Sequence, residues 1–412
     1  MTEYGVPGAA LAVAYNGRLV YSRGFGYADS ATKQTVAPDS LFRIGSISKP
    51  FTAVAVLKLV EEGRLDLDAE AFKILDIRPP GGEALDQRIW SITVRELLEH
   101  SGGLGRQVLD PMFFSTSVAK AVGAPAPASC ETVIRYMMMT GLLDFTPGTR
   151  YEYSNFGYCV LGRIIEKTTG MGYEDYMKAE VLAPMGIVDM QSGHTQLAFR
   201  GPNEVHYYDG EDRMVQSVFQ NVTEPVPYPY GGFYLEALDS VGGWIASAQG
   251  LVRFALSVDG ARPPAYLRPE TVDIMLARNT VLWPTGDHYY ALGWEVTYSS
   301  WWHAGGVPGS AALLVKMPNG VAWAVLFNKC CHDTELFPDA DQSLRKAFNE
   351  TTSWPSWDLF STQISTSSTA SSLHSALTET VTPTTISLLV GAGLVIVVAG
   401  GIFLRRRRKQ SS

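Results

Sequence analysis

The sequence predicts an α+β fold in which one large domain builds an antiparallel sheet from both of its ends, with a mainly helical insert between them. Apolar runs joined by tight turns occur near both ends, at residues 9–25 and 289–327, and indicate strands. The chain between them is mostly helical in pattern. Hydrophobic residues make up 46% of the 412 residues, enough to bury a large core.

The first two strands form a hairpin over residues 9–15 and 19–25, because Asn16-Gly17 between them is a strong two-residue turn signal. Three more strands are expected near the other end, at residues 289–296, 311–316 and 321–327. A helix over residues 339–349 then closes the domain against the sheet, so the domain spans residues 1–350.

The most informative local pattern is Ser46-Ile47-Ser48-Lys49, where an apolar run gives way to a helical stretch that ends near Glu62. Residues three apart share a helix face, so the Ser46 hydroxyl and the Lys49 amine lie within reach of each other. A serine hydroxyl becomes a good nucleophile only beside a base, and a lysine serves when desolvation lowers its pKa. Ser117 and Lys120 have the same spacing, but no long apolar helix follows them, and this context favours Ser46.

Two more clusters accompany that motif. Tyr153-Ser154-Asn155 follows a Pro-Gly turn and precedes a helical pattern, so by itself it is typical of a helix cap. His303-Ala304-Gly305-Gly306 precedes a strand-like run, and alone His303 is more typical of a satisfied structural histidine.

Taken together and in this order, the three clusters resemble those of the penicillin-recognising serine hydrolases, in the class C beta-lactamase and LACTB-like branch. The resemblance covers most of residues 5–349. It extends to further segments of the chain: Val6 to Ala10, Glu99-His100-Ser101-Gly102-Gly103-Leu104, Pro184-Met185-Gly186-Ile187, Gly242 to Ser247, Leu292-Gly293-Trp294 and Phe327-Asn328. It implies a beta-lactamase/transpeptidase-like fold, with Tyr153 carried on the helical insert.

The resemblance also implies an acyl transfer through a covalent intermediate, without any cofactor. Ser46 would attack a carbonyl, Lys49 would help to remove its proton, and Tyr153 would shuttle a proton to the leaving group.

Four further residues would bind the substrate or stabilise the oxyanion. Asn155 would hydrogen-bond the substrate, and His303 would present an electropositive or hydrogen-bonding group where many relatives have lysine. Gly305 and Gly306 would let substrate lie close to the strand. The backbone N–H groups of Ser46 and Gly306 would form the oxyanion hole, worth about 10²- to 10³-fold per donor.

Ala304 departs from the family pattern, because relatives usually carry a threonine or serine there that can bind a substrate carboxylate. Together with His303, it favours an esterase, amidase or peptidase acting on a small-molecule or peptide acyl substrate, with beta-lactam hydrolysis at most incidental. The alternative is a catalytically inactive receptor or scaffold protein on the same fold. The sequence does not determine the oligomeric state.

Charge argues against nucleic acid as a partner. The formal net charge is −8, and five basic residues at 405–409 contribute +5, which leaves −13 for the rest of the chain. Metal binding is not expected either, because Cys330, Cys331 and His332 are adjacent and leave no loop between ligands. The four cysteines, Cys130, Cys159, Cys330 and Cys331, suit up to two disulfides outside the cell, but no pairing can be assigned from the sequence. Cys159 falls in an apolar helical pattern, where a buried free thiol fits at least as well.

The composition changes after residue 350. Residues 351–385 are rich in serine and threonine and predict a solvated stalk. Residues 386–404 are an uncharged apolar run, about 28 Å long as a helix, and predict a C-terminal transmembrane helix. Residues 405–412 form a short basic tail.

The basic tail places its side of the membrane in the cytosol and the catalytic domain outside the cell or in a lumen. Candidate glycosylation sites at Asn221 and Asn349 agree with that orientation. Met1 runs directly into the first strand without an apolar leader, which favours a natural start with a signal peptide further upstream. The competing hypothesis is a tail-anchored protein with its enzyme in the cytosol.

Overall fold

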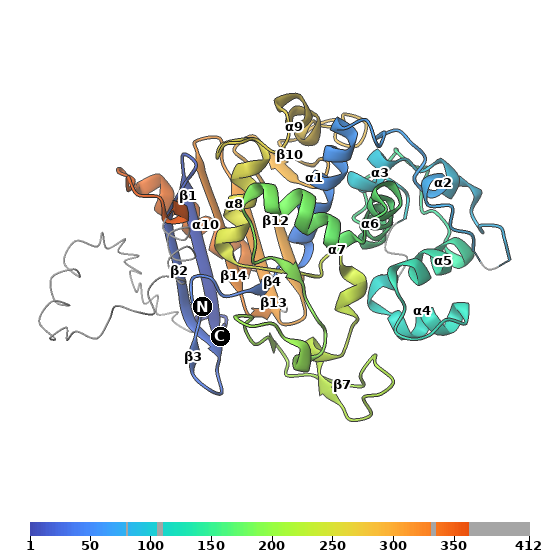
Figure 1. The fold of residues 1–412 in the computed structure, drawn as a ribbon, viewed down its shortest axis with the longest axis horizontal. Helices are drawn as coiled ribbons and strands as arrows, with labels where there is room; N and C mark the ends of the chain where they lie inside the picture. Colours follow the sequence, from blue (N-terminus) through green and yellow to red (C-terminus); the bar gives the residue numbers. More distant parts are fainter. Residues whose placement is uncertain (80, 105–109, 331–334, 362–412) are drawn as a thin grey trace, which may run out of the picture.

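The computed structural model describes residues 1–79, 81–104, 110–330 and 335–361, and its centre is an eight-stranded sheet (Figure 1). Neighbouring strands in this sheet pair antiparallel. In spatial order the strands are β10 (His288–Tyr290), β11 (Glu295–Thr297), β12 (Ser300–Val307), β13 (Ser310–Lys316), β14 (Val321–Phe327), β1 (Gly8–Tyr15), β2 (Arg18–Asp29) and β3 (Gln34–Thr35).

The two ends of the domain meet in the middle of this sheet. Strand β1 pairs with β2 on one side and with β14 on the other, where Ala9 lies opposite Phe327. The prediction of an antiparallel sheet built from both ends is therefore confirmed, and so are the hairpin and the strands at 311–316 and 321–327.

Helices cover both faces of the sheet and fill the insert. They are α1 (Ser48–Glu61), α2 (Ala71–Leu75), α3 (Val94–Leu98), α4 (Ser115–Val122), α5 (Cys130–Thr140), α6 (Asn155–Thr169), α7 (Tyr173–Tyr176), α8 (Ala248–Val258), α9 (Pro269–Leu276) and α10 (Leu336–Glu350). Short pairings join β4 (Phe42–Arg43) and β5 (Gln191–Ser192) to β9 (Trp244–Ala246), β6 (Tyr208–Asp209) to β15 (Lys329–Cys330), and β7 (Met214–Val215) to β8 (Val226–Pro227).

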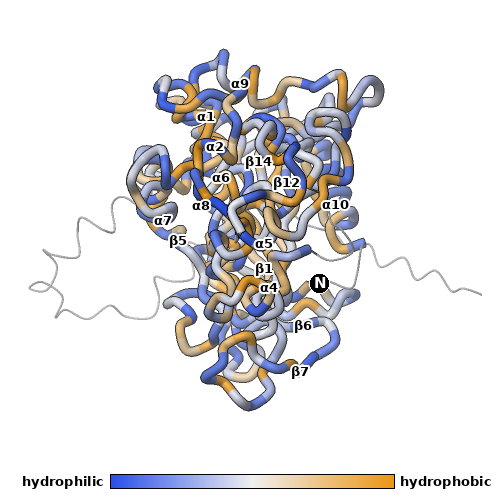
Figure 2. Tube along the Cα trace, turned by 90° about the vertical axis from the view of Figure 1, so that its right-hand side faces the viewer, coloured by the Kyte–Doolittle hydropathy of each residue, from blue (hydrophilic) through white to orange (hydrophobic). Residues whose placement is uncertain are grey.

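The apolar core lies in two layers, one on each face of the sheet. The larger layer includes α1, α6 and α8, and the smaller one joins the outer face of β1, β13 and β14 to α10. Hydrophilic residues gather in outer turns such as those near α9 and β7 (Figure 2). Two buried layers fix the sheet on both sides, so residues at its edge are held in defined positions.

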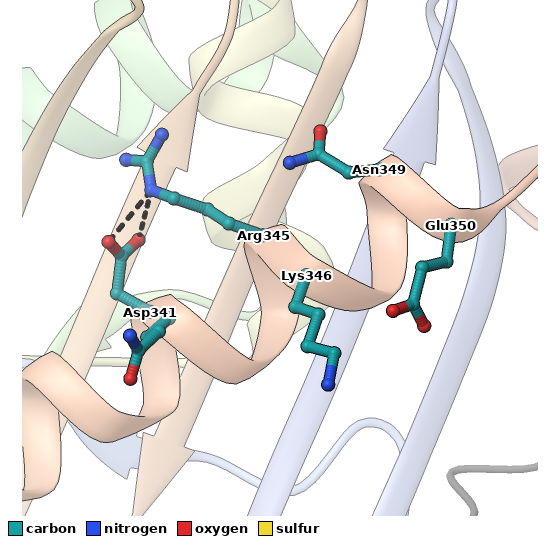
Figure 3. A pocket seen from close by; sticks show the side chains of 6 residues that line it. Asp341, Arg345, Lys346, Asn349 and Glu350 are labelled. Carbon is teal, nitrogen blue, oxygen red and sulfur yellow. Dashed lines mark hydrogen bonds and ion pairs between the residues drawn. The ribbon is translucent and has the colours of Figure 1, made fainter.

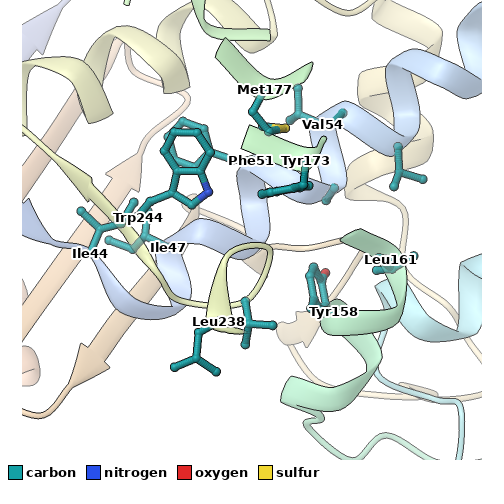
Figure 4. Close-up of a cluster of buried hydrophobic side chains, with 14 of the residues drawn as sticks. Ile44, Ile47, Phe51, Val54, Tyr158, Leu161, Tyr173, Met177, Leu238 and Trp244 are labelled. Carbon is teal, nitrogen blue, oxygen red and sulfur yellow. The ribbon is translucent and has the colours of Figure 1, made fainter. Parts of the chain in front are cut away.

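Helix α1 runs through the larger layer and is buried along most of its length. Phe51 stacks on Phe254 with ring centroids 3.7 Å apart, and Figure 4 shows Phe51 and Val54 among side chains from several elements. Full burial of one such aromatic side chain contributes about 1.5–3 kcal/mol. The segment that begins with Ser46 is therefore attached to one of the most firmly packed helices of the domain.

The insert contains a disulfide that could not be assigned from the sequence. Cys130 at the start of α5 bonds to Cys159 in α6, with 5.9 Å between their Cα atoms. The interpretation of Cys159 as a buried free thiol is therefore wrong. Its apolar surroundings suit a disulfide equally well, because a half-cystine is itself apolar.

Two strand predictions need correction. The stretch 289–296 is not one strand but two short strands, β10 and β11, because Gly293 has a φ of +86° and turns the chain between them. Strand β12, which carries His303, was not counted among the predicted strands, since its two adjacent glycines lower strand propensity.

The folded chain also continues past residue 350, where the stalk was expected to begin. Trp354 stacks on Tyr15 at 4.6 Å, and Phe360 is buried. The aromatic residues of this segment supply the apolar surface that the serine and threonine residues lack. The predicted stalk beyond residue 361, the membrane span 386–404 and the tail lie outside the described residues, within which no helix is long and apolar enough to cross a bilayer.

Candidate active site

Ser46 lies in a short 3₁₀ turn, Gly45–Ile47, immediately before α1. The turn is possible because Gly45 has a φ of +52°, which side chains disfavour. A Cβ atom at Gly45 would lie 2.5 Å from the backbone nitrogen of Gly306 in β12. The nucleophile turn and strand β12 are therefore in direct backbone contact.

Lys49 is fully buried in the first turn of α1, beneath Ser46. Its ammonium nitrogen donates to Ser46 Oγ at 3.1 Å, to Asn155 Oδ1 at 2.7 Å and to the Val241 carbonyl at 3.0 Å. These three acceptors match the three N–H donors of a lysine ammonium. They hold Lys49 against the hydroxyl it is expected to activate.

Tyr153 approaches Ser46 from the insert, just before α6. Its hydroxyl donates to Ser46 Oγ at 2.8 Å, and Lys49 Nζ lies 4.8 Å from the centre of its ring. Desolvation raises the pKa of Tyr153 well above its usual value, while the hydrogen bond to Ser46 opposes this shift. The phenol therefore keeps its proton at neutral pH.

Asn155 is the first residue of α6, and its amide connects the Lys49 ammonium to the carboxylate of Asp110. The N-cap is Ser154, whose hydroxyl accepts from Gly157 N, so Asn155 is left free to face Lys49. Asn155 Nδ2 donates to Asp110 Oδ2 at 2.5 Å. The two neighbours fix which end of the amide points at Lys49.

His303 is buried in β12 and is hydrogen-bonded at both ring nitrogens. Nδ1–H donates to the Ala304 carbonyl at 2.6 Å, and the Tyr290 hydroxyl donates to Nε2 at 3.1 Å. Burial, helped by the nearby Lys49 ammonium, lowers the pKa of His303 to about 3. Of the two roles expected for His303, the structure therefore favours the hydrogen-bonding one over the electropositive one at neutral pH.

Gly305 and Gly306 lie where β12 crosses the nucleophile turn. A Cβ atom at Gly305 would lie 1.9 Å from the Ile44 carbonyl oxygen and 2.9 Å from Ser46 N. The missing side chain at Gly305 thus makes room for the turn that carries Ser46. The sequence had instead predicted that it makes room for substrate. The close approach brings the backbone of Gly306 beside that of Ser46, as a shared oxyanion hole requires. Ala304 points to the other face of the sheet and packs against the smaller core layer.

Two residues of the site had no role assigned from sequence. His100 is buried with its ring 4.3 Å from that of Tyr153 and 4.6 Å from that of Tyr290, and its Nδ1 accepts from Ser154 N. Burial lowers the pKa of His100 well below its usual value, so it supports Tyr153 as a neutral ring. Asp110 carries no local motif, and only its contact with Asn155 reveals it.

Other candidates lie away from this cluster. Ser117 and Lys120 are exposed on α4, whereas Lys49 is buried. The sequon residues Asn221 and Asn349 are both exposed. Figure 3 shows Asn349 in the last turn of α10, on the same edge as Arg345, which pairs with Asp341 at 2.7 Å. Among the described residues, no cluster of His, Cys, Asp or Glu could hold a metal ion.

The chain matches a family model described as Beta-lactamase over residues 1–343. It is 26% identical over 353 residues to penicillin-binding protein 4* of Bacillus subtilis, covering 81% of this chain and 70% of that protein. It is 30% identical over 254 residues to esterase EstB of Burkholderia gladioli, covering 56% of this chain and 62% of the esterase.

Solved structures show the same fold. An octameric penicillin-binding protein homologue from Pyrococcus abyssi has a TM-score of 0.60 at 27% identity, with 80% of this chain and 71% of that chain covered. A D-amino acid amidase from Ochrobactrum anthropi has a TM-score of 0.64 at 23% identity, with 85% and 96% covered. The curated and structural relatives therefore include penicillin-binding proteins, esterases and amidases.

Proposed function

Because this chain belongs to the beta-lactamase family and is an acyl-serine hydrolase of that family, we propose that Ser46 is its nucleophile and that it acts as a membrane-anchored esterase, amidase or peptidase. One observation carries the assignment of Ser46. Its Oγ receives hydrogen bonds from both Lys49, at 3.1 Å, and Tyr153, at 2.8 Å. A serine flanked by a lysine and a tyrosine has a base and an acid within direct reach.

The first half of the reaction forms the acyl-enzyme. Ser46 Oγ attacks the substrate carbonyl carbon while Lys49, in its neutral form, takes the hydroxyl proton. The backbone N–H groups of Ser46 and Gly306 stabilise the oxyanion. The carbonyl then re-forms as the bond to the leaving group breaks. Tyr153 donates its proton to the leaving atom and recovers one from Lys49, which agrees with the raised pKa of the phenol.

The second half releases the acid. A water molecule enters in place of the leaving group, and its oxygen bonds to the acyl carbon while one of its protons passes through Tyr153 to Lys49. The bond from the acyl carbon to Ser46 Oγ then breaks, and the same proton returns to Oγ. His303 acts as a neutral hydrogen-bonding group that holds Tyr290 beside Tyr153. With a neutral His303 and Ala304 turned to the far face of the sheet, the site offers little for the carboxylate of a penicillin, so beta-lactam hydrolysis is incidental.

The test is covalent labelling of the full chain with a fluorophosphonate, with the modified residue located by peptide mass spectrometry. We expect an adduct on Ser46 that is lost in Ser46→Ala. Ser117→Ala is the matched control, because Ser117 shares the motif spacing but is exposed on α4. A folded protein with no adduct would instead favour the inactive receptor or scaffold, and labelling of Ser117 would refute the motif assignment. A penicillin probe in parallel tests the substrate class.

The catalytic domain is extracellular or lumenal in this proposal, anchored through residues 386–404. The Cys130–Cys159 disulfide supports such a compartment, because disulfides persist in oxidising surroundings and are rare in the cytosol. The exposure of Asn221 and Asn349 agrees with glycosylation there. Enzymatic removal of N-glycans should increase the electrophoretic mobility of the full chain. A cytosolic, tail-anchored protein would show no change.

A further inference from the structure

His100 ends helix α3 in a backbone conformation that favours glycine. Its φ is +59°. Its N–H donates to the Leu97 carbonyl at 3.4 Å, and the Ser101 N–H donates to the Glu96 carbonyl at 2.7 Å. This pair of bonds is the Schellman motif, whose left-handed position is usually glycine and sometimes asparagine. The helix end alone therefore does not account for a histidine at this position.

His100 also binds the chain on both sides of Tyr153. The Glu152 N–H donates to the His100 carbonyl at 2.9 Å, and the Ser154 N–H donates to His100 Nδ1 at 3.1 Å. Between these two bonds the imidazole packs on the Tyr153 ring, with centroids 4.3 Å apart. One residue thus holds the backbone before and after Tyr153 as well as its side chain.

The imidazole of His100 is buried and neutral. Nδ1 accepts a hydrogen bond, so Nε2 carries the proton, and no described residue accepts a hydrogen bond from Nε2. Burial, helped by the charge of Lys49, lowers the pKa of His100 well below its usual value. A buried donor without an acceptor and a left-handed φ both reduce stability, and such costs gather at functional sites. Here both occur on a residue that touches Tyr153.

The other groups around the Tyr153 ring hold it less firmly. Lys49 Nζ lies 4.8 Å from the ring centre, and the Tyr290 ring meets it edge-on at 6.3 Å. Lys49 exchanges protons during the reaction and Tyr290 is further away, so His100 is the contact that stays constant. The phenol oxygen lies at the end of the ring away from the backbone, where a small rotation moves it most. A misplacement of about 1 Å can cost about 10²-fold in rate.

Resting on the acyl-transfer function proposed above, we propose that His100 is a positioning residue that aims the Tyr153 hydroxyl at the leaving atom. His100 touches no substrate and transfers no proton. It acts through Tyr153, by fixing the direction in which the phenol donates. The effect of His100 is therefore large where the leaving group needs a proton and small where it does not.

The substitution His100→Asn in the full chain tests this role. Asparagine suits the left-handed position of a helix end, and its Oδ1 can accept from the Ser154 N–H as Nδ1 does. The variant thus keeps the backbone contacts and removes the ring. We expect kcat/KM, which reports acylation, to fall about 10- to 100-fold on ethyl butyrate and to stay near the wild-type value on 4-nitrophenyl butyrate.

His206→Asn is the matched control. It also removes an imidazole that packs on a tyrosine, but that ring belongs to Tyr230, 6.5 Å away, and not to Tyr153. Both esters should be hydrolysed at wild-type rates. His100→Gly, which the φ of +59° also suits, is a second variant and should have the same selective loss as His100→Asn. Urea unfolding checks that the variants fold.

A double variant separates the positioning of Tyr153 from a general loss of structure. Tyr153→Phe has no phenol oxygen to aim, so adding His100→Asn should cause no further loss on ethyl butyrate. Losses that multiply in the double variant would show that His100 acts independently of Tyr153, and would overturn the proposal. An equal loss on the two esters in either single variant of His100 would overturn it as well.

Fluorophosphonate labelling separates a failure of this proposal from a failure of the proposed function. Fluoride is a weak base and leaves without taking a proton, so Ser46 of His100→Asn should be labelled at close to the wild-type rate. Labelling of Ser46 together with equal losses on the two esters refutes the role of His100 alone. No labelling of the wild-type protein refutes the acyl-serine assignment, and the role of His100 with it.

Discussion

Lys49 Nζ lies 3.1 Å from Ser46 Oγ although the two residues belong to different elements, the first to α1 and the second to the 3₁₀ turn before it. The separation is short because the turn runs directly into α1, with helical backbone at Ile47 and Ser48, so residues three apart lie on the same face. The lysine is held in place by the buried helix rather than by solvent-exposed contacts, so the base is preorganised before substrate binds.

Replacing Lys49 with methionine should therefore lower kcat by about 10²- to 10⁴-fold, the usual contribution of a general base. Methionine keeps the unbranched apolar stem, so the core around α1 should be preserved. Ester hydrolysis and the rate of fluorophosphonate labelling measure the loss. Lys120→Met in the exposed copy of the motif is the control and should have wild-type rates. An active Lys49→Met enzyme would require another base.

Tyr153→Phe should have an effect that depends on the leaving group. The phenol keeps its proton because burial raises its pKa, and it donates that proton to the departing atom. Nitrophenolate departs without a proton, whereas an alkoxide needs one. The variant should thus lose about 10²- to 10⁴-fold in kcat on an ethyl ester and distinctly less on a 4-nitrophenyl ester. Equal losses on both esters would contradict an acid role for Tyr153.

The sequence predicted the cluster of Ser46, Lys49 and Tyr153 from local patterns with defined offsets, and the structure brings the three side chains together. The sequence also placed the strands whose apolar residues are continuous, as in residues 311–316 and 321–327. Asp110 and His100 could not be given roles in the same way. Their functional neighbours, Asn155 and Tyr153, are distant in sequence, and only tertiary packing joins them.

The same reasoning explains the protonation of His303. Position 303 was identified as part of the site from its motif, but its charge depends on burial and on Lys49, which no local pattern reports. The split of 289–296 into β10 and β11 likewise depends on Gly293, which packs against Ala53 of α1. Contacts between elements, which no local sequence pattern reports, decide both the charge of His303 and the division into β10 and β11.

Gly305→Ala should impair the site through its backbone. The added methyl would lie 1.9 Å from the Ile44 carbonyl oxygen, so β12 and the nucleophile turn must separate. Overpacking of this kind costs about 1–3 kcal/mol of stability, and displacement of the oxyanion donors should also slow labelling of Ser46. Gly172→Ala is the control, since its Cβ would meet only the Asp175 side chain at 3.5 Å. Urea unfolding and labelling rates of the two variants test this, and a wild-type rate in Gly305→Ala would refute the contact.

His303 should make the domain less stable in acid. Its pKa is lowered from about 6.5 when unfolded to about 3 when folded, so below pH 6.5 the unfolded state binds a proton that the folded state does not. The contribution of His303 to the free energy of unfolding is fully present above pH 6.5. It falls by about 1.4 kcal/mol per pH unit between pH 6 and pH 3. His303→Gln should have a shallower decline in urea unfolding free energy over that range. An unchanged slope would show that His303 is protonated in the folded state.

The Cys130–Cys159 disulfide should contribute measurably to the stability of the insert, because it closes a loop with a sequence separation of 29 residues. Loss of a cross-link that closes a loop of this length typically costs about 3.6 kcal/mol, through the freedom restored to the unfolded chain. Cys330 is also disulfide-bonded, so a reductant would act on more than the insert. The double substitution Cys130→Ala and Cys159→Ala isolates the effect. We expect its urea midpoint to fall, with Ser46 still labelled at low urea because Asn155 and Tyr153 are held by their own hydrogen bonds. An unchanged midpoint would mean that packing of α5 on α6 alone holds the insert together.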